Sequence, residues 1–425
     1  MTPDRLIFLQ AAWRHGDRSP LNTFKNDINQ EDKWEQGWGQ LTTRGMSQHV
    51  KLGRKLREKY VKDLQFISGT YKNHEIYVRS TDVNRTLTSA ISNLIGFYGE
   101  GAREGVDYPN IPDWPMHFIP IAVHTVDTDN DHVGNPGAFC PRGDAIKKLV
   151  RKTPEYKQLM KEKEWLFHNL TIYCGEEINP TNFGMVATAL YIEDIWSLTR
   201  NPWVTRELMN EINDVNWILK SWHNGERLKP YKGFDFSLEL AKIRGGGIIW
   251  DMITNMRSKM DCLKQTRPNV SRKKEISPLC NWVNPLKYYV YSVHDTTLAA
   301  LFATFGFNKT NYDIDGYPHY SACVTVELWQ RVDGSNYIKV HYWIPGDEIK
   351  IVELTNHIVG CENGCSLEQF AARSLRYKAE PTPEIHCQNT ELGEAGSSAM
   401  PILIISAFNL LGLAVSNFGF NYLLM

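Results

Sequence analysis

The sequence predicts an α/β fold: a three-layer sandwich with a mostly parallel central sheet and an α-helical insertion that forms a cap. Two observations predict it. Apolar runs that lead into polar turns and helical patterns occur near both ends of the chain, and several further helical patterns lie between them. We therefore expect an α/β core at residues 1–140 and 263–388, a mainly helical insertion at 141–262, a polar linker at 389–400 and a hydrophobic tail at 401–425.

The first quarter of the chain alternates between strand and helix patterns. Residues 5–13 form a short apolar run that is typical of a buried strand. Residues 41–45 supply cap residues for the helical pattern that follows them. Residues 75–80 predict a second strand, after which Thr81 or Asp82 can cap another helix. Such alternation is typical of the parallel part of an open sheet.

The rest of the chain separates into a helical part and a second strand-rich part. The helical patterns lie at residues 181–197, 203–222 and 236–260. Residues 287–293 are apolar and β-branched, which predicts a strand leading into a helix that ends near Gly306. Residues 322–330 and 337–343 predict a hairpin, because a short polar turn joins them.

Composition and charge exclude several classes of protein. The 425 residues are 42% hydrophobic and 12% aromatic, as expected for a folded protein with a large core. Lys plus Arg is 47 and Asp plus Glu is 48, so the net charge is −1. This near balance excludes a strongly basic nucleic-acid binder, and we expect no nucleic-acid partner.

The cysteines indicate an oxidising compartment. They are Cys140, Cys174, Cys262, Cys280, Cys323, Cys361, Cys365 and Cys387, and they lack zinc-site spacing. This even, scattered set favours a disulfide-bonded glycoprotein of the secretory pathway, with eight reduced thiols as the alternative. Four sequons, at Asn84, Asn169, Asn269 and Asn308, agree with secretion. No signal peptide begins the sequence, and we expect that one is missing from it rather than that the chain is cytosolic.

The last residues of the sequence predict a membrane anchor. Residues 401–425 contain no charged side chain and are long enough, as a helix, to cross a bilayer. We expect this tail to hold the protein on an extracellular or lysosomal membrane. A GPI signal is a competing interpretation, because residues 393–398 are small and polar apart from one glutamate. A buried terminal helix is the other alternative.

The strongest chemical signal is Arg-His-Gly-Asp-Arg-Ser-Pro at residues 14–20, directly after the first predicted strand. Ligands of open α/β sheets bind beyond the carboxyl ends of the strands. Arg14 and Arg18 can donate paired hydrogen bonds to phosphate, and a neutral His15 can attack phosphorus. Gly16 would let the backbone approach a ligand closely. Taken alone, a basic surface loop is an equal alternative.

Two further strand ends carry side chains that suit phosphate. Arg79 lies at the end of the second predicted strand, and His294 and Asp295 follow the strand at 287–293. Helix N-termini at these turns would also favour an anion. The alternative is that Asp295 is a helix cap and Arg79 a surface residue in a salt bridge. Three such turns together favour a phosphate site.

In these residues the sequence resembles the histidine acid phosphatases, branch 2 of the histidine phosphatase superfamily. The heptad at 14–20, the helix start at 41–45, the turn at 79–82 and the pair at 294–295 occur in the family's order. The resemblance covers roughly residues 5–388. It is strongest to the animal prostatic and lysosomal type, and nematode secreted forms look similar.

The resemblance implies a role for each candidate residue. His15 would be the nucleophile that becomes a phosphohistidine, and Asp295 would protonate the leaving alcohol. The phosphate pocket would consist of Arg14, Arg18, Arg79 and His294. No metal or cofactor would be needed, because cationic side chains supply the electrostatic stabilisation. The implied disulfides are Cys140–Cys387, Cys174–Cys323 and Cys361–Cys365, which leaves Cys262 with Cys280.

The predicted activity is hydrolysis of small phosphate monoesters at acid pH, by a chain that can form a homodimer. A narrow-substrate enzyme, such as a phytase or a lysophosphatidate phosphatase, is the first alternative. The second is a catalytically silent, membrane-held binding protein on the same fold. Intact His15 and Asp295 favour the enzyme.

Overall fold

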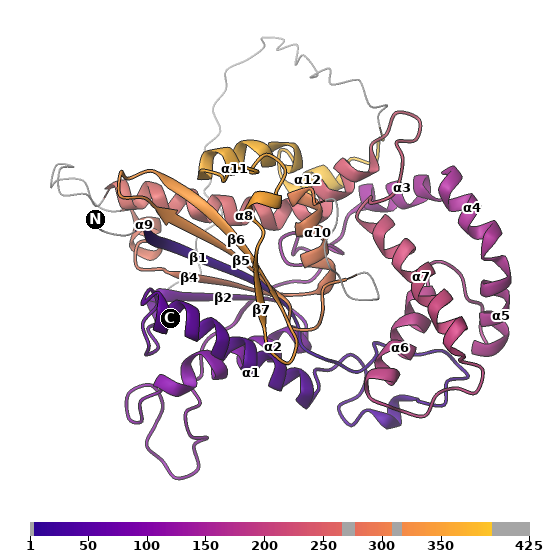
Figure 1. Ribbon diagram of the computed structural model, residues 1–425, viewed down its shortest axis with the longest axis horizontal. Helices are drawn as coiled ribbons and strands as arrows, with labels where there is room; N and C mark the ends of the chain where they lie inside the picture. The colour runs from indigo at the N-terminus through magenta and orange to yellow at the C-terminus, as the bar shows by residue number, and fades with distance from the viewer. Residues whose placement is uncertain (1–3, 266–276, 308–316, 393–425) are drawn as a thin grey trace, which may run out of the picture.

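A seven-stranded sheet with helices on both faces forms the centre of the molecule (Figure 1). The computed structural model describes residues 4–265, 277–307 and 317–392. The strand order is β3-β2-β4-β1-β5-β6-β7. Pairing is parallel from β3 to β1 and antiparallel from β1 to β7. The predicted fold class is confirmed, and β1 separates a parallel half of the sheet from an antiparallel half.

The parallel half positions the predicted site. Its strands are β1 (Arg5–Arg14), β2 (Ile76–Thr81), β3 (His124–Val126) and β4 (Tyr288–Val293). The apolar run of β1 is buried from its second residue onward. In the sheet register, Trp13 of β1 and Ser80 of β2 both lie opposite Ser292 of β4. These three strands therefore end level with one another, and the residues that follow them meet at one sheet edge.

The antiparallel half consists of β5 (Cys323–Gln330), β6 (Asn336–Ile344) and β7 (Lys350–Glu353). β5 and β6 form the predicted hairpin, which turns at Gly334. This glycine has a φ of +87°, a conformation that side chains with a Cβ rarely adopt.

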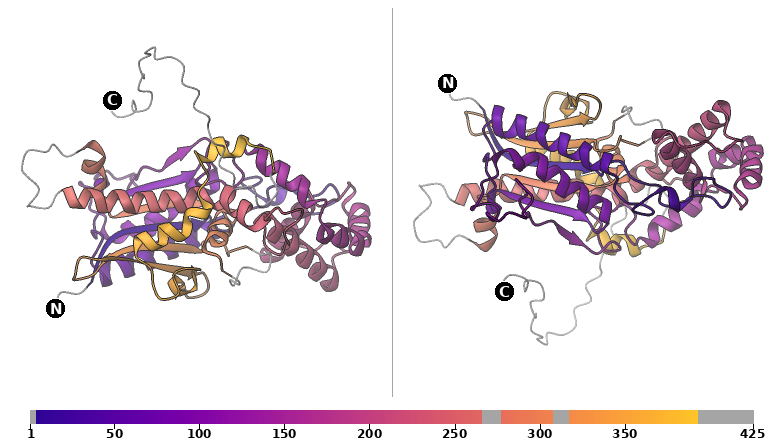
Figure 2. Two further views of the ribbon diagram at one scale, coloured as in Figure 1. Left: turned by 90° about the horizontal axis from the view of Figure 1, so that it is seen from above. Right: turned by 90° about the horizontal axis from the view of Figure 1, so that it is seen from below.

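Helices cover both faces of the sheet, which confirms the three layers (Figure 2). Helices α1 (Thr43–Arg57) and α2 (Asn84–Tyr98) pack on one face. Helices α8 (Phe236–Gln265), α10 (Asp295–Phe305) and α11 (Leu367–Ser374) pack on the other. Short 3-10 or π-helical turns occur at Glu31–Lys33, Glu58–Asp63, Asn73–Glu75, Gly99–Gly101, Thr355–His357 and Leu375–Tyr377.

The cap lies beyond the carboxyl edge of the parallel strands and has a hydrophobic core of its own (Figure 1). Its helices are α3 (Pro141–Val150), α4 (Pro154–Glu162), α5 (Glu164–Cys174), α6 (Phe183–Ile195) and α7 (Arg206–His223). Phe24, which precedes the insertion in sequence, is fully buried in this core. The loop after β1 is therefore packed against the cap as well as against the sheet.

Helix α8 belongs to the cap and to the core at once. Phe236 and Leu240 in its first turns are part of the cap's hydrophobic cluster. Ile248, Met252 and Met256 further along are part of the cluster under the sheet. The predicted insertion at 141–262 thus contains a helix half that packs against the sheet.

Three consecutive glycines mark the point where α8 passes from cap to core. A Cβ added at Gly245–Gly247 would lie within 2.2 Å of a backbone carbonyl oxygen in each case. The three carbonyls belong, in order, to Ala300, Tyr377 and His132. Glycine in a helix interior costs about 1 kcal/mol relative to alanine, so close packing against three separate segments explains the sequence here.

The structure contains three of the four predicted disulfides. Cys140–Cys387 joins the start of α3 to α12 (Pro383–Gln388), and Cys262–Cys280 joins α8 to α9 (Pro278–Val283). Cys361–Cys365 closes a small loop before α11. The predicted Cys174–Cys323 bridge is wrong, because both residues are free and buried. Cys174 ends α5 inside the cap cluster, whereas Cys323 begins β5 inside the sheet cluster.

Several predictions concern residues outside the described ranges. The tail at 401–425 and the sequons at Asn269 and Asn308 lie there. Of the two described sequons, Asn84 is exposed at the start of α2 and Asn169 is half-buried in α5. Within residues 4–265, 277–307 and 317–392, none of the helices has the length and apolarity to span a membrane.

Candidate active site

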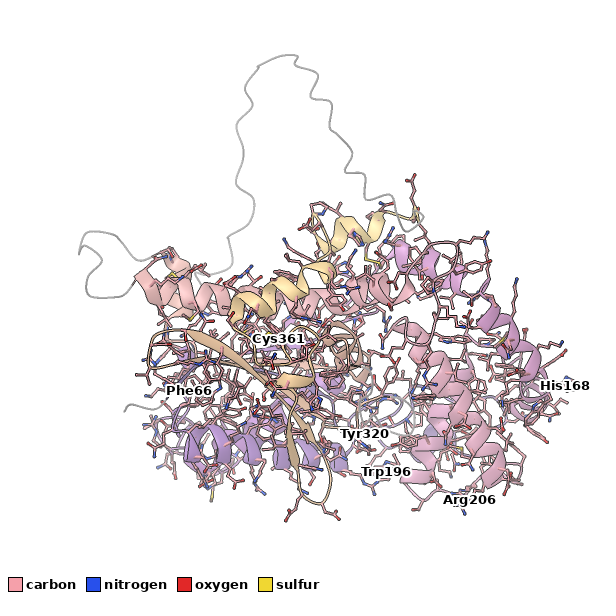
Figure 3. All side chains as sticks on the ribbon, turned by 45° about the horizontal axis from the view of Figure 1, so that its top comes forward. Phe66, His168, Trp196, Arg206, Tyr320 and Cys361 are labelled. Atoms are coloured by element: carbon pink, nitrogen blue, oxygen red, sulfur yellow. A yellow bond between two sulfur atoms is a disulfide. The ribbon has the colours of Figure 1, made fainter. Side chains whose placement is uncertain are left out.

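Three loops meet at the carboxyl edge of the parallel strands, between sheet and cap. Arg14 is the last residue of β1 and His15 follows it, while His294 follows β4 and Asp295 begins α10. The rings of His15 and His294 have centroids 5.5 Å apart. The ring of Tyr320 lies 5.9 Å from that of His15, and Figure 3 shows Tyr320 at the junction of sheet and cap. The fold therefore brings the predicted nucleophile and the predicted acid together.

His15 is held as a neutral imidazole with a defined reactive nitrogen. Its Nδ1 lies 2.8 Å from the carbonyl oxygen of Gly16. Because a carbonyl only accepts hydrogen bonds, Nδ1 carries the proton and the lone pair is on Nε2. Burial, followed by Arg85 and Arg14, lowers the pKa of His15 well below its usual value. The side chain thus stays uncharged, and able to attack, at acid pH.

His294 is also neutral and is hydrogen-bonded at both nitrogens. Its Nε2 lies 2.9 Å from the Thr81 hydroxyl, and its Nδ1 lies 3.4 Å from Nη2 of Arg85. Because a guanidinium only donates, Nδ1 accepts and Nε2 donates to the Thr81 hydroxyl. Burial and the Arg85 charge lower the pKa of His294 to about 3. In this geometry His294 orients Arg85 toward the site.

Arg14 links the reacting groups to the segment that precedes β5. Its Nη2 forms a 3.0 Å ion pair with Asp295, and its Nη1 donates to the Pro318 carbonyl at 2.5 Å. Its guanidinium also lies 4.1 Å from the centre of the Tyr320 ring. The side chain is only 2% exposed, so these contacts are shielded from water.

Arg18 and Arg85 form the rest of the cationic pocket. Nη1 of Arg18 donates to the Ser19 carbonyl at 2.9 Å. Among the described residues, the buried Nε atoms of both arginines have no hydrogen-bond partner, and neither guanidinium forms an ion pair with a carboxylate. Burial and the Arg18 charge lower the pKa of Arg85 to about 10, which leaves it protonated. Closely placed cations with available donors suit a phosphate group.

The prediction that Arg79 lines this pocket is wrong. Arg79 lies within β2, two residues before the strand ends, and pairs at 2.5 Å with Asp131, whose side chain is fully buried. Arg85, in the first turn of α2, occupies the predicted position beside His15 and His294. The sequence contains a signal for this: an arginine in the first turn of the helix that follows a strand end.

Asp295 is ionised in the ligand-free enzyme. Its carboxylate accepts a hydrogen bond from the Thr296 backbone N–H at 2.7 Å in addition to the Arg14 ion pair. Burial raises its pKa, but Arg14 and then Lys220 lower it further, and the result lies well below the usual range. An acid role for this side chain therefore needs a proton that arrives with the substrate.

Backbone packing fixes the loop that carries His15. A Cβ on Gly16 would lie 2.4 Å from the carbonyl oxygen of Gly45, and one on Gly45 would lie 2.3 Å from that of Asp17. Gly16 is therefore required by its contact with α1, and not only by approach to a ligand as predicted. Its N–H donates to the Ser89 hydroxyl at 3.1 Å. His49 of α1, which the sequence analysis missed, lies with Nε2 3.1 Å from the Arg14 carbonyl oxygen.

Asp17 connects the same loop to the cap. One of its carboxylate oxygens accepts hydrogen bonds from the Thr42 hydroxyl at 2.6 Å and from Trp196 Nε1 at 3.0 Å. Trp196 follows α6 and also lies under the Arg44 guanidinium, 5.0 Å from the ring centre. In the view of Figure 3, Trp196 is labelled between the sheet and the cap. The cap is thus attached to the loop that carries the nucleophile.

Comparisons with known proteins agree with this geometry. The model of the histidine phosphatase superfamily (branch 2) matches residues 5–343. Bovine lysosomal acid phosphatase is 30% identical over 408 residues, which cover 94% of this chain and 83% of the relative. Rat prostatic acid phosphatase is 28% identical over 375 residues, covering 86% and 85%. A Caenorhabditis elegans protein whose name describes an acid phosphatase is 30% identical over 399 residues, covering 89% and 87%.

Solved structures agree in fold. The phytase of Hafnia alvei in complex with tartrate superposes with a TM-score of 0.61 over 91% of this chain and 99% of its own. Its sequence identity is 15%, so the likeness concerns the architecture alone.

Proposed function

Because the chain belongs to branch 2 of the histidine phosphatase superfamily, it is a histidine acid phosphatase, and we propose how its residues hydrolyse a phosphate monoester. Nε2 of His15 attacks phosphorus, forming a P–N bond while the P–O bond to the alcohol breaks. Arg14, Arg18, Arg85 and His294 surround the non-bridging oxygens. Water then attacks the phosphohistidine and restores His15.

One observation carries this proposal: a neutral His15 lies among arginines with its lone pair fixed on Nε2. A nucleophile must be uncharged to attack, whereas the phosphate group that it attacks needs positive charge around it. Burial and the neighbouring cations meet both needs at once, since the same charges that bind phosphate keep the imidazole deprotonated.

Asp295 handles the proton in both steps. The carboxylate is ionised in the free enzyme, so we propose that a substrate monoanion passes its phosphate proton to Asp295. The departing alkoxide takes that proton and leaves as the alcohol. In the second step the carboxylate accepts a proton from the attacking water and passes it to the departing phosphate, which leaves as the monoanion and returns Asp295 to its ionised state. Protons therefore balance over the cycle, and His15 ends neutral.

This scheme predicts a specific pH profile. The second pKa of a phosphate ester is about 6, so the monoanion is lost above that pH. We expect kcat/KM to fall about tenfold per pH unit above pH ~6 and to stay level down to pH ~4. The level acid side follows because the lowered pKa of His15 keeps it neutral there. A fall centred near pH 6.5 on the acid side would show that His15 titrates normally, which contradicts the scheme.

Trapping the intermediate tests the nucleophile. Rapid mixing with a labelled ester, followed by quenching in base, should leave a base-stable, acid-labile label on the protein. Replacing His15→Ala should abolish this label and lower turnover by about 10⁴-fold or more, because no other group would accept phosphorus. His168→Ala, which removes an exposed histidine of α5, is the matched control. Labelling of the His15→Ala protein would reject the proposal.

A screen over esters decides how broad the activity is. A member of the family that accepts a narrow range, such as a phytase or a lysophosphatidate phosphatase, would hydrolyse few of them. A silent binding protein would hydrolyse none, including p-nitrophenyl phosphate. The neutral, oriented His15 supports turnover over silence.

We propose that the chain belongs to the secretory pathway or the lysosome, which the names of its relatives and its disulfides support. We further propose that residues 401–425 hold it at a membrane, because this stretch is uncharged. Deleting residues 399–425 should then release active enzyme from cells. Full-length protein that is already released would reject the anchor. A homodimer is proposed from the resemblance, and light scattering of the purified chain tests it.

A further inference from the structure

A chain of two hydroxyl groups contacts His294 at the ring nitrogen that does not face Arg85. Nε2 of His294 lies 2.9 Å from Oγ1 of Thr81, and that oxygen lies 2.9 Å from Oγ1 of Thr86. Thr81 is the last residue of β2, and Thr86 is in the first turn of α2. The two threonines are 2% and 0% exposed. These hydrogen bonds are therefore shielded from solvent.

The direction of each hydrogen bond in this chain follows from its acceptors. The Thr86 hydroxyl lies 2.8 Å from the Val83 carbonyl oxygen and 3.0 Å from that of Thr81. Because carbonyls only accept, Thr86 donates its single proton to the backbone, and its oxygen accepts from the Thr81 hydroxyl. The Thr81 hydroxyl has then used its own proton, so it accepts from Nε2 of His294. The protons are thus ordered in one direction, from His294 to the backbone.

The other side of the imidazole requires the same tautomer. A guanidinium has only donors, so Nδ1 of His294 carries the lone pair where it meets Nη2 of Arg85 at 3.4 Å. The opposite tautomer would turn an N–H of His294 toward an N–H of Arg85. The pKa of His294, which burial and Arg85 lower to about 3, keeps the ring neutral at acid pH. Its neighbours therefore decide which nitrogen carries the proton.

The start of α2 is itself fixed to the strands that lead into the site. Oγ of Ser292 donates to the Thr86 carbonyl oxygen at 2.7 Å, and it accepts from Nε1 of Trp13 at 2.9 Å. Ser292 is in β4 and Trp13 is in β1, the strands that His294 and His15 follow. The acceptor end of the hydroxyl chain is thus held in place relative to both histidines.

We propose that Thr81 is a positioning residue of the reaction: its hydroxyl fixes His294 in the tautomer that accepts a hydrogen bond from Arg85. Thr86 orders the proton of that hydroxyl. With Nη2 held by His294, the Arg85 guanidinium keeps one orientation toward the transferring phosphate. This inference rests on the proposed function, because it assumes that Arg85 binds the phosphate.

Removing the Thr81 hydroxyl tests the inference in the full-length enzyme. Thr81→Val keeps the shape of the side chain but leaves Nε2 of His294 without its acceptor, so the ring can change tautomer and oppose Arg85. We expect kcat/KM for p-nitrophenyl phosphate to fall by about tenfold. Thr81→Ser restores the hydroxyl and should recover most of the activity. Thr88→Val is the matched control: it removes a hydroxyl that donates to the Asn84 carbonyl at 2.8 Å, outside the chain, and should keep wild-type activity.

A double-mutant cycle distinguishes positioning from packing. Arg85→Ala removes the group that Thr81 positions, so adding Thr81→Val to it should lower kcat/KM by less than about twofold. If the Thr81 hydroxyl only supported the fold, its loss would lower kcat/KM by the same factor with and without Arg85. Equal factors in the two backgrounds would overturn the proposal.

The tautomer is measurable directly in the ligand-free wild-type protein. At pH ~5.5, where the ring is neutral, the protonated and unprotonated nitrogens of ¹⁵N-labelled histidine differ in chemical shift. The His294 signals are those that disappear in His294→Asn. We expect the Nε2–H form in the wild type and in Thr81→Ser, and a change toward the Nδ1–H form in Thr81→Val. An Nδ1–H form in the wild type would overturn the proposal.

The outcomes separate this inference from the proposed function. Full activity of Thr81→Val would overturn the role of Thr81 and leave the chemistry of His15 intact. A wild-type enzyme that hydrolyses no ester would instead contradict the proposed function, whereas the spectrum would still report the tautomer. If Thr81→Val fails to fold, Thr81→Ala replaces it in each measurement, and the wild-type spectrum decides on its own.

Discussion

The sheet edge and the cap contribute to the active site in different ways. At the sheet edge, backbone contacts position the reactive groups: His15 bonds to the Gly16 carbonyl, and Gly16 packs against the backbone of Gly45. On the cap, side chains such as Trp196 and Lys220 reach the site from helix ends. Chemistry that depends on backbone geometry tolerates little substitution, whereas side chains on helix ends can change without moving the fold.

The two regions also differ in how their charges are held. Arg14 and Arg18 at the sheet edge are buried, Arg14 with only 2% exposure, and Arg85 is half-buried. Charge in a shielded site acts strongly on phosphate, because little water screens it. Lys220 on the cap is partly exposed, so its effect on the pKa of Asp295 is weaker than that of Arg14 and depends on salt. We therefore expect variants at the sheet edge to lose more activity than variants on the cap.

The largest effect in this comparison should come from Asp295. Asp295→Ala should slow phosphoryl transfer from esters with poor leaving groups by about 10²–10⁴-fold, because the alkoxide then departs without a proton. The loss should be smaller for p-nitrophenyl phosphate, whose leaving group needs less protonation. Single-turnover rates over esters of different leaving-group pKa measure this. Equal losses across the series would show that Asp295 positions Arg14 and does not supply a proton.

A second comparison separates Arg85 from Arg79. Arg85→Ala should lower kcat/KM by about 10²-fold, because one donor to the transferring phosphate is lost. Its stability should change little, since removing this half-buried cation also relieves repulsion from Arg18. Arg79→Ala should instead destabilise the fold by about 3 kcal/mol, because the carboxylate of Asp131 would be left buried without its partner.

Activity assays and denaturant unfolding at neutral pH measure both quantities for each variant. A large loss of kcat/KM in a stable Arg79→Ala protein would show that Arg79 belongs to the phosphate pocket, which would contradict the assignment of Arg85. Arg85→Lys is a further control, because it keeps the charge but loses the planar donors. We expect it to recover only part of the activity.

The smallest effect concerns the two free cysteines. Burial raises the pKa of Cys174 to about 12 and that of Cys323 still further, so neither thiol is reactive in the folded protein. Denatured, unreduced protein should therefore contain two free thiols per chain, which alkylation and mass spectrometry can count. Cys174→Ala should cost about 1–2 kcal/mol, the loss of a small buried side chain. A count of zero free thiols would show that Cys174 and Cys323 form the fourth bridge.

The sequence predicted those parts of the site that depend on neighbouring residues. His15 and His294 each follow a buried strand directly, so strand patterns alone place them at the carboxyl edge of the sheet. Arg79 was misassigned for the opposite reason. Arg79 lies two positions before the end of its strand, and its ion pair with Asp131 decides where its side chain is held. Asp131 is more than fifty residues away along the chain, so the local pattern could not show this pair.

The remaining differences depend on which distant segments share a core. Cys174 and Cys323 belong to separate hydrophobic clusters, and spacing along the chain carries no information about that. The predicted boundary of the insertion differs from the structure for the same reason. α8 is one continuous helix through both clusters, and its sequence pattern does not show which part packs in which cluster. The family resemblance gave the disulfide pattern of its relatives, but it could not show that Cys174 ends a cap helix in this chain.

The glycines of α8 have a consequence for how substrate reaches the site. A lid that closes over a ligand needs a hinge, a short segment that can change its backbone angles. At Gly245–Gly247 the helix runs unbroken from cap to core and touches three carbonyl oxygens from separate segments. These contacts prevent bending at the one place where a hinge would be most effective. These contacts hold the cap against the core along α8, so we expect substrate binding to require no closure of a domain.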